Sequence, residues 1–182
     1  MKATGIVRRI DDLGRVVIPK EIRRTLRIKE GTPLEIFTDR EGEVILKKYS
    51  PIGELSIFAR EYAEALTQTT GMVTCITDHD QVVAASGAGS KDYLGKEISK
   101  NLEEVISERV GKCVNIMDRG KVPVTYDKKD VQVAQVIQPI ICAGDAIGSV
   151  ILMGKSEKDS MGQAEKMLVQ TAAGFLGRQM EQ

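Results

Sequence analysis

The chain has 182 residues, 42% of them hydrophobic and 29% charged, which suits one or two small globular domains and argues against a disordered chain. No apolar run approaches the roughly 20 residues that a membrane span needs, and the charged N-terminal residues do not resemble a signal peptide, so we expect a cytoplasmic protein without membrane contact. The net charge is zero, yet residues 1–29 hold nine Lys or Arg against three Asp or Glu, which indicates a basic end for a polyanion such as nucleic acid.

Residues 1–50 predict two β-hairpins joined by a short helix. Runs rich in Val and Ile indicate strands, and clusters of Asp and Gly between them indicate turns. Pro19 ends the second strand and suits the first turn of the helix. The expected elements are strand 5–10, turn 11–14, strand 15–18, helix 20–26, strand 33–38, turn 39–42 and strand 43–48.

A unit this small buries too little apolar surface to be stable alone, and its strands leave open edges. Its sequence offers neither a disulfide nor metal ligands. We therefore expect residues 1–50 to form an obligate dimer.

A connector at 51–54 is expected to lead into a second domain, 55–182. Its apolar spacing changes between helical and strand periods, which predicts an α+β fold with an antiparallel sheet and flanking helices. Ser160 and Gln163 form a capping-box signal for the last helix. The expected elements are helix 55–70, strands 72–77 and 81–86, loop 87–95, helix 98–106, strands 113–117, 131–141 and 146–153, a turn at Gly144 and Asp145, and helix 160–180. The polar segment 118–130 is expected to cover the sheet.

The candidate site is a set of arginines in the basic N-terminal region. Arginine suits phosphate because its fork bonds two oxygens, and it can also bond guanine O6 and N7 in the major groove. Strand alternation places neighbouring arginines on opposite faces, whereas a helix places them about 100° apart. Solvated charges paired with Asp11, Asp12 and Glu21 are the alternative. The arginine set comprises Arg8, Arg9, Arg15, Arg23, Arg24 and Arg27. The first five of these are the candidate contact residues.

The run LGRVVIPKEIRRTL, within residues 1–50, closely resembles the DNA-binding domain of the AbrB family of transition-state regulators. This resemblance implies a dimeric swapped-hairpin β-barrel that contacts double-stranded DNA through arginines matching Arg8, Arg15, Arg23 and Arg24. Arg9 stands where a basic residue is usual and ranks second.

The whole chain resembles sporulation regulators of spore-forming bacilli that join an AbrB-like domain to a GAF domain. The order of helices and strands in the second domain fits a GAF fold. The resemblance implies a nucleoid-associated activator and repressor of forespore genes. It also allows an unknown small ligand between the sheet and its covering loops, where the sequence supplies 78–80 (Asp-His-Asp) and 91–93 (Lys-Asp-Tyr). A domain that only oligomerises is the alternative.

We expect a homotetramer, paired through the barrel at one end and through apolar faces of the helices near 54–70 and 160–180 at the other. The spacing of Cys75, Cys113 and Cys142 matches no metal motif, so we expect no metal, no cofactor and no catalytic residue. Two alternatives stay open. One is an antitoxin of the MazE type, which shares the barrel. The other is a thiol-dependent free methionine sulfoxide reductase using Cys75 near His79.

Overall fold

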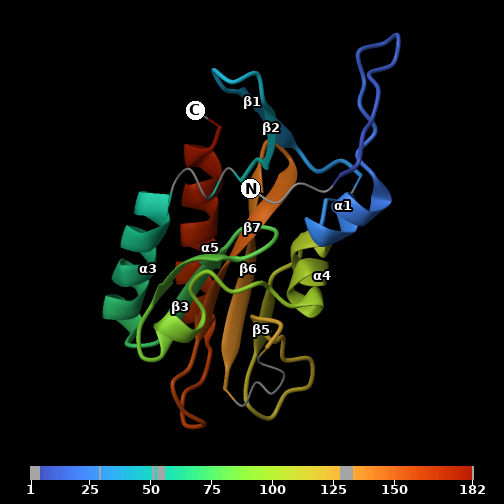
Figure 1. Cartoon of the computed structure of the whole chain (residues 1–182). Helices are drawn as coiled ribbons and strands as arrows, with labels where there is room; N and C mark the ends of the chain where they lie inside the picture. Colours follow the sequence, from blue (N-terminus) through green and yellow to red (C-terminus); the bar gives the residue numbers. More distant parts are fainter. Residues whose placement is uncertain (1–4, 29, 51, 53–55, 128–132, 182) are drawn as a thin grey trace. The chain divides into compact units, whose positions relative to one another are not determined.

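The computed structural model describes residues 5–28, 30–50, 52, 56–127 and 133–181 (Figure 1). The chain divides into two compact units, Met1–Tyr49 and Ser50–Gln182, and each is described by itself. Of the connector expected at 51–54, residues 51, 53 and 54 lie outside the described part of the chain, whereas Ile52 is fully buried in the core of the second unit.

The N-terminal unit contains one short helix and one regular hairpin. The helix α1 spans Lys20–Thr25 and follows Pro19, whose carbonyl oxygen accepts a 2.9 Å hydrogen bond from Arg23 N. The strands β1 (Leu34–Thr38) and β2 (Val44–Lys48) pair antiparallel, with Leu34 opposite Lys48 and Thr38 opposite Val44. These three elements confirm the predicted helix and second hairpin to within two residues.

The first predicted hairpin has the expected turn but no regular strands. Asp11 Oδ1 accepts hydrogen bonds from the backbone N–H groups of Leu13 and Arg15, and Asp11 N donates to Arg15 O. Asp39 closes the β1–β2 turn with the same pattern of bonds. The prediction of strands at 5–10 and 15–18 is therefore wrong for the single chain. A strand is stabilised by a ladder and a buried face, and both arms are exposed except at Ile18.

The N-terminal unit lacks a core of its own. Among its described residues only Pro19 is buried. Val7 is 88% exposed and Ile36 is 70% exposed, although their side chains belong to the types that normally fill a protein interior. Leu26, predicted to face inward from α1, is 52% exposed. Other large apolar residues of this unit with substantial exposure are Ile6, Ile10, Leu13, Val16, Val17, Phe37, Val44, Ile45 and Leu46.

The C-terminal unit is built on a five-stranded antiparallel sheet with the order β4-β3-β7-β6-β5. The central strand β7 pairs with β3 on one side and with β6 on the other. β4 and β5 are the two edge strands of the sheet. The strands are β3 (Val73–Thr77), β4 (Val82–Ser86), β5 (Lys112–Val114), β6 (Gln135–Cys142) and β7 (Asp145–Met153).

Helices cover both faces of this sheet (Figure 1). The helices α3 (Ser56–Thr70) and α5 (Gln163–Gln179) pack side by side on one face, and the rings of Tyr62 and Phe175 lie 5.3 Å apart between them. The helix α4 (Lys100–Glu108) packs on the other face. A short helix, η1 (Ser90–Asp92), precedes α4 in the chain. The predicted antiparallel sheet with flanking helices is confirmed.

A covering segment completes the α4 side of the sheet. Val122 and Val124 are buried there, and the fully buried Gln135 side chain bonds both the N–H and the C=O of Val122. This confirms the predicted cover for the described part of 118–130, while residues 128–130 lie outside it. None of the helices in the described residues is long and apolar enough to cross a bilayer.

Several local predictions for this unit are wrong in their bounds. The β6–β7 turn is Ala143 and Gly144, with φ of 48° and 87°, because a two-residue hairpin of this kind needs positive φ at both positions. Asp145 is already in the ladder, opposite Cys142. The last helix begins after Gly162, whose N–H bonds Glu165 Oε2 at 2.8 Å, so Ser160 is not its cap.

The fifth strand ends at Val114 rather than at residue 117. Beyond it, the Asn115 side chain accepts from Met161 N at 2.7 Å and donates to Met161 O at 3.2 Å. These bonds fix the Asn115 side chain to the backbone of Met161, shortly before α5. The strand expected at 131–141 begins at Gln135 instead, and residues 131 and 132 lie outside the described part of the chain.

Candidate nucleic-acid interface

Three of the five candidate arginines flank the first turn of the N-terminal unit. Arg8 and Arg9 precede Asp11 in the chain, and Arg15 follows it. The carboxylate of Asp11 is occupied by two backbone N–H groups, at 3.0 Å from Leu13 and 2.7 Å from Arg15. This acid therefore shapes the turn, and all three arginine side chains are exposed.

The other two candidates lie in the last turn of α1. Arg23 and Arg24 are both exposed, while Ile22 on the same helix is half-buried. Leu26 N bonds Ile22 O at 2.9 Å and Ile28 N bonds Arg23 O at 2.8 Å, which closes the helix end. The helix thus turns its arginines toward solvent.

Across the described residues, none of the five arginines has a side-chain hydrogen bond or an ion pair. The alternative of arginines neutralised by Asp11, Asp12 and Glu21 is not what the single chain contains. An exposed guanidinium without a protein partner keeps all its donors for an external anion. The set therefore has the chemistry of a phosphate-binding surface carried by one small unit.

The residues suggested for a ligand site in the C-terminal unit are dispersed. Asp78 is 5% exposed and accepts hydrogen bonds from its own turn, whereas His79 is exposed. Lys91 and Asp92 are exposed on η1. The space expected for the ligand, between the sheet and its covering segment, is packed with buried apolar side chains that include Val73, Cys75, Ile98, Leu102, Val122 and Ile151.

The positions of Cys75 and His79 do not suit the thiol-dependent reductase chemistry considered above. Cys75 is fully buried in β3 and belongs to the apolar cluster below α4, whereas His79 is exposed in the following turn. Cys142 is half-buried, and its burial, followed by the charges of Glu181 and Asp145, raises the pKa of its thiol. A raised pKa leaves less of the nucleophilic thiolate at neutral pH.

One exposed arginine escaped the sequence reasoning. Arg60 lies on α3 and lines a pocket together with residues of β4 and Leu94. The apolar period of 55–70 predicts only a helix with one buried face, and it carries no signal that links residue 60 to residues 83–85. Only the packing of α3 against the edge of the sheet brings them together.

Comparison with known proteins covers both units. The family model described as stage V sporulation protein T C-terminal, transcription factor, matches residues 54–181. The model described as antidote-toxin recognition MazE, bacterial antitoxin, matches residues 7–54. The latter model covers the N-terminal unit and only a few residues beyond it.

Curated relatives match both parts of the chain. Stage V sporulation protein T of Bacillus subtilis (strain 168) is 55% identical over 182 residues, which is 100% of each chain. Transition state regulatory protein AbrB of the same organism is 42% identical over 116 residues, covering 64% of this chain and 97% of AbrB.

The fold of the C-terminal unit is that of a GAF domain. The GAF domain from an Acinetobacter phosphoenolpyruvate-protein phosphotransferase superimposes with a TM-score of 0.57, covering 69% of this chain and 81% of its own at 11% identity. The likeness at this identity concerns the fold alone. With the family relationship extending over the whole length, the chain belongs to the stage V sporulation protein T family of transcription factors, with an AbrB-type N-terminal unit and a GAF-type C-terminal unit.

Proposed function

We propose that this transcription factor binds double-stranded DNA through Arg8, Arg15, Arg23 and Arg24, with Arg9 in a secondary role. The observation that carries the proposal is that these exposed side chains have no partner among the described residues. Phosphate contacts position such a protein on the duplex, and bidentate contacts to guanine select the sequence. The surplus of acidic residues in the rest of the chain disfavours a second phosphate-binding surface there.

The DNA-binding form is a dimer in which two N-terminal units interleave their hairpins into one barrel. The exposed apolar side chains of this unit support the proposal, since a single copy leaves them in water. The formed turn at Asp11 supports it further. This turn keeps the two arms of the hairpin, residues 5–10 and 15–18, close together. Their unpaired backbone groups can then form β-sheet hydrogen bonds with strands of a second copy. Two-fold symmetry then presents each arginine twice.

A second contact between copies joins dimers into a tetramer through α3 and α5. These helices lie side by side, and their exposed apolar residues include Phe58 at 45% and Met167 at 56% exposure. A self-complementary contact of this kind closes two dimers without open ends. Light scattering at micromolar protein should report four chains, and a stable dimer of the full chain would contradict this arrangement.

The GAF-type unit modulates DNA binding and holds a small ligand outside the packed space between its sheet and the covering segment. Its own folded core, separate from the basic unit, supports a role apart from the DNA surface. The name of the relative, stage V sporulation protein T, supports a role in sporulation. We propose that the protein acts in the nucleoid of the forespore, with activation or repression set by the position of the site at each promoter. An antitoxin role has less support, because the match to the transcription-factor model extends over most of the chain.

The test measures operator affinity against salt for alanine variants of the four primary arginines. Each variant loses two copies per dimer, and one good arginine contact is worth about 1–3 kcal/mol, so affinity should fall about tenfold to a thousandfold or more. Loss of one phosphate contact should also lower the salt slope by about 0.9. Arg→Lys should partly spare phosphate contacts and weaken guanine selection.

Arg40→Ala is the matched control, because Arg40 is exposed in the β1–β2 turn of the same unit and lies outside the candidate set. Circular dichroism checks the fold of each variant. If all four folded variants bind the operator as tightly as the control, the proposed DNA surface is wrong.

A further inference from the structure

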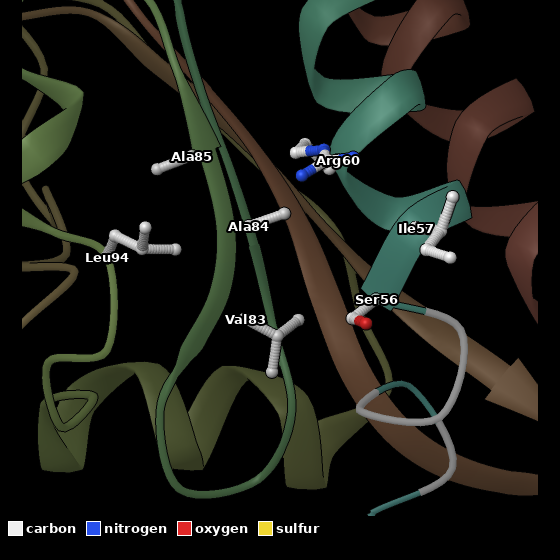
Figure 2. A pocket seen from close by; sticks show the side chains of 7 residues that line it. All are labelled: Ser56, Ile57, Arg60, Val83, Ala84, Ala85 and Leu94. Atoms are coloured by element: carbon white, nitrogen blue, oxygen red, sulfur yellow. The ribbon is translucent and has the colours of Figure 1, made fainter.

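A pocket lies between α3 and the edge strand β4 of the C-terminal unit (Figure 2). Its volume is about 220 Å³. Residues from the start of α3 lie on one side of β4, and Leu94, from the loop that follows β4, lies on the other side of the strand in this view (Figure 2). The lining consists of Ser56, Ile57, Arg60, Val83, Ala84, Ala85 and Leu94.

The helix side of the pocket is electropositive. Ser56 and Arg60 are four residues apart on α3, so their side chains lie on the same face of the helix. Arg60 is exposed and makes no hydrogen bond or ion pair within the described residues.

The strand side is apolar and open. The side chains of Val83, Ala84 and Leu94 contribute only carbon to the pocket (Figure 2). β4 pairs with β3 along one edge. On its other edge, among the residues that the structure describes, only Val82 bonds to the backbone of the following loop, at Gly95 and Lys96. The pocket therefore lies beside a strand edge that its own unit covers only at one end.

We propose that this pocket binds a small organic anion, a carboxylate with a short apolar chain. The carboxylate accepts hydrogen bonds from Arg60 and Ser56, and the chain packs against Val83, Ala84 and Leu94. Charge complementarity favours an anion, because the Arg60 guanidinium makes no ion pair within the described residues. The inference rests on the proposal that this unit holds a small ligand, and it names the ligand's class and place.

The size of the pocket limits the length of the acid. A volume of about 220 Å³ is smaller than the roughly 300–1,000 Å³ of pockets that hold drug-sized ligands, so a nucleotide or tetrapyrrole is too large. A carboxylate with a chain of a few carbons matches this space.

The test uses the full chain with methyl-labelled alanine and isoleucine, observed by NMR during titration with pentanoate. Saturable shifts are expected at the methyls of Ile57 and Ala84. Pentanol, which has the chain without the charge, and inorganic phosphate, which has the charge without the chain, should each bind at least about tenfold more weakly. The methyls of Ile98 and Ala146 report on the opposite face of the sheet.

Two variants and one control complete the test. Arg60→Gln should weaken pentanoate binding at least about tenfold, since it removes a charge-assisted hydrogen bond. Leu94→Asp should abolish it by placing an anion in the lining of the pocket, and Leu94 is 54% exposed, so the fold should survive. Arg119→Gln removes an exposed arginine of the same unit outside the pocket and should bind as the parent does.

Absence of saturable shifts at Ile57 and Ala84, or parental affinity in Arg60→Gln, would overturn the assignment. Saturable shifts confined to Ile98 and Ala146 would place the ligand on the other face, which overturns this pocket but leaves a ligand-holding function intact. A change of oligomeric state in Arg60→Gln without any pentanoate binding would assign the surface to a second copy of the chain instead.

Discussion

Ser50 Oγ donates a 2.7 Å hydrogen bond to Asp78 Oδ2, linking residues 28 positions apart in the chain. The second oxygen of Asp78 accepts bonds of 2.7 Å from the backbone N–H groups of Asp80 and Gln81. One carboxylate, 5% exposed, thus shapes the β3–β4 turn and ties down the residue at which the C-terminal unit begins.

Asp78→Ala should therefore lower the free energy of unfolding of the C-terminal unit by about 2–4 kcal/mol, because buried hydrogen-bonding groups lose a charged partner. Ser50→Ala removes the hydrogen bond from Ser50 to Asp78 but leaves the β3–β4 turn intact, and it should lower the free energy of unfolding by about 1 kcal/mol. Denaturant unfolding measures both values. Equal stabilities for the two variants would show that Asp78 does not stabilise the turn.

Two glycines of α5 should respond in opposite directions to alanine. A Cβ on Gly177 would lie 2.1 Å from Ile141 O of β6, so Gly177→Ala must push the helix from the sheet and should cost about 1–3 kcal/mol or more. A Cβ on Gly174 meets nothing within 4 Å, so Gly174→Ala should stabilise the helix by about 0.5–1 kcal/mol. Thermal unfolding at one protein concentration tests the pair. A stabilised Gly177→Ala variant would contradict the close packing of α5 on β6.

The three cysteines should be dispensable for DNA binding. Cys75 is buried, Cys113 is exposed and Cys142 is half-buried with a raised thiol pKa. Replacing all three by alanine should cost about 1–2 kcal/mol of stability, chiefly through the space left at Cys75. Operator affinity should stay within twofold of the parent, about the precision of such an assay. Complete loss of binding in a folded triple variant would reveal a redox or metal role.

A fragment of residues 1–50 should dimerise and bind DNA, more weakly than the full chain because it lacks linked binding modules. Ile36 and Leu46 are directly opposite in the β1–β2 ladder and are 70% and 44% exposed in the single chain. Ile36→Asp should abolish the dimer, because the dimer buries apolar surface that a charge cannot enter cheaply. Analytical ultracentrifugation measures the oligomeric state of the fragment and of its Ile36→Asp variant. A folded monomeric fragment that binds DNA would refute the dimer argument.

Local sequence patterns determined most of the elements. Alternating and helical apolar spacings located β1, β2, α3, α4 and α5, and the run around Pro19 and Arg23 indicated the family. These signals work because side-chain period and turn chemistry are properties of neighbouring residues. The same reasoning singled out the arginines, since their type and clustering in the basic region are visible without a fold.

Tertiary structure decided what the pattern could not. Gly162 rather than Ser160 caps α5, because Asn115 holds the preceding backbone at Met161 and the chain turns into the helix only after it. The arms at 5–10 and 15–18 have strand composition yet form no ladder in one chain, since a ladder depends on a partner that lies outside the local sequence. The pocket at Arg60 exists only because α3 packs beside the edge of β4, a contact between distant segments that no periodicity encodes.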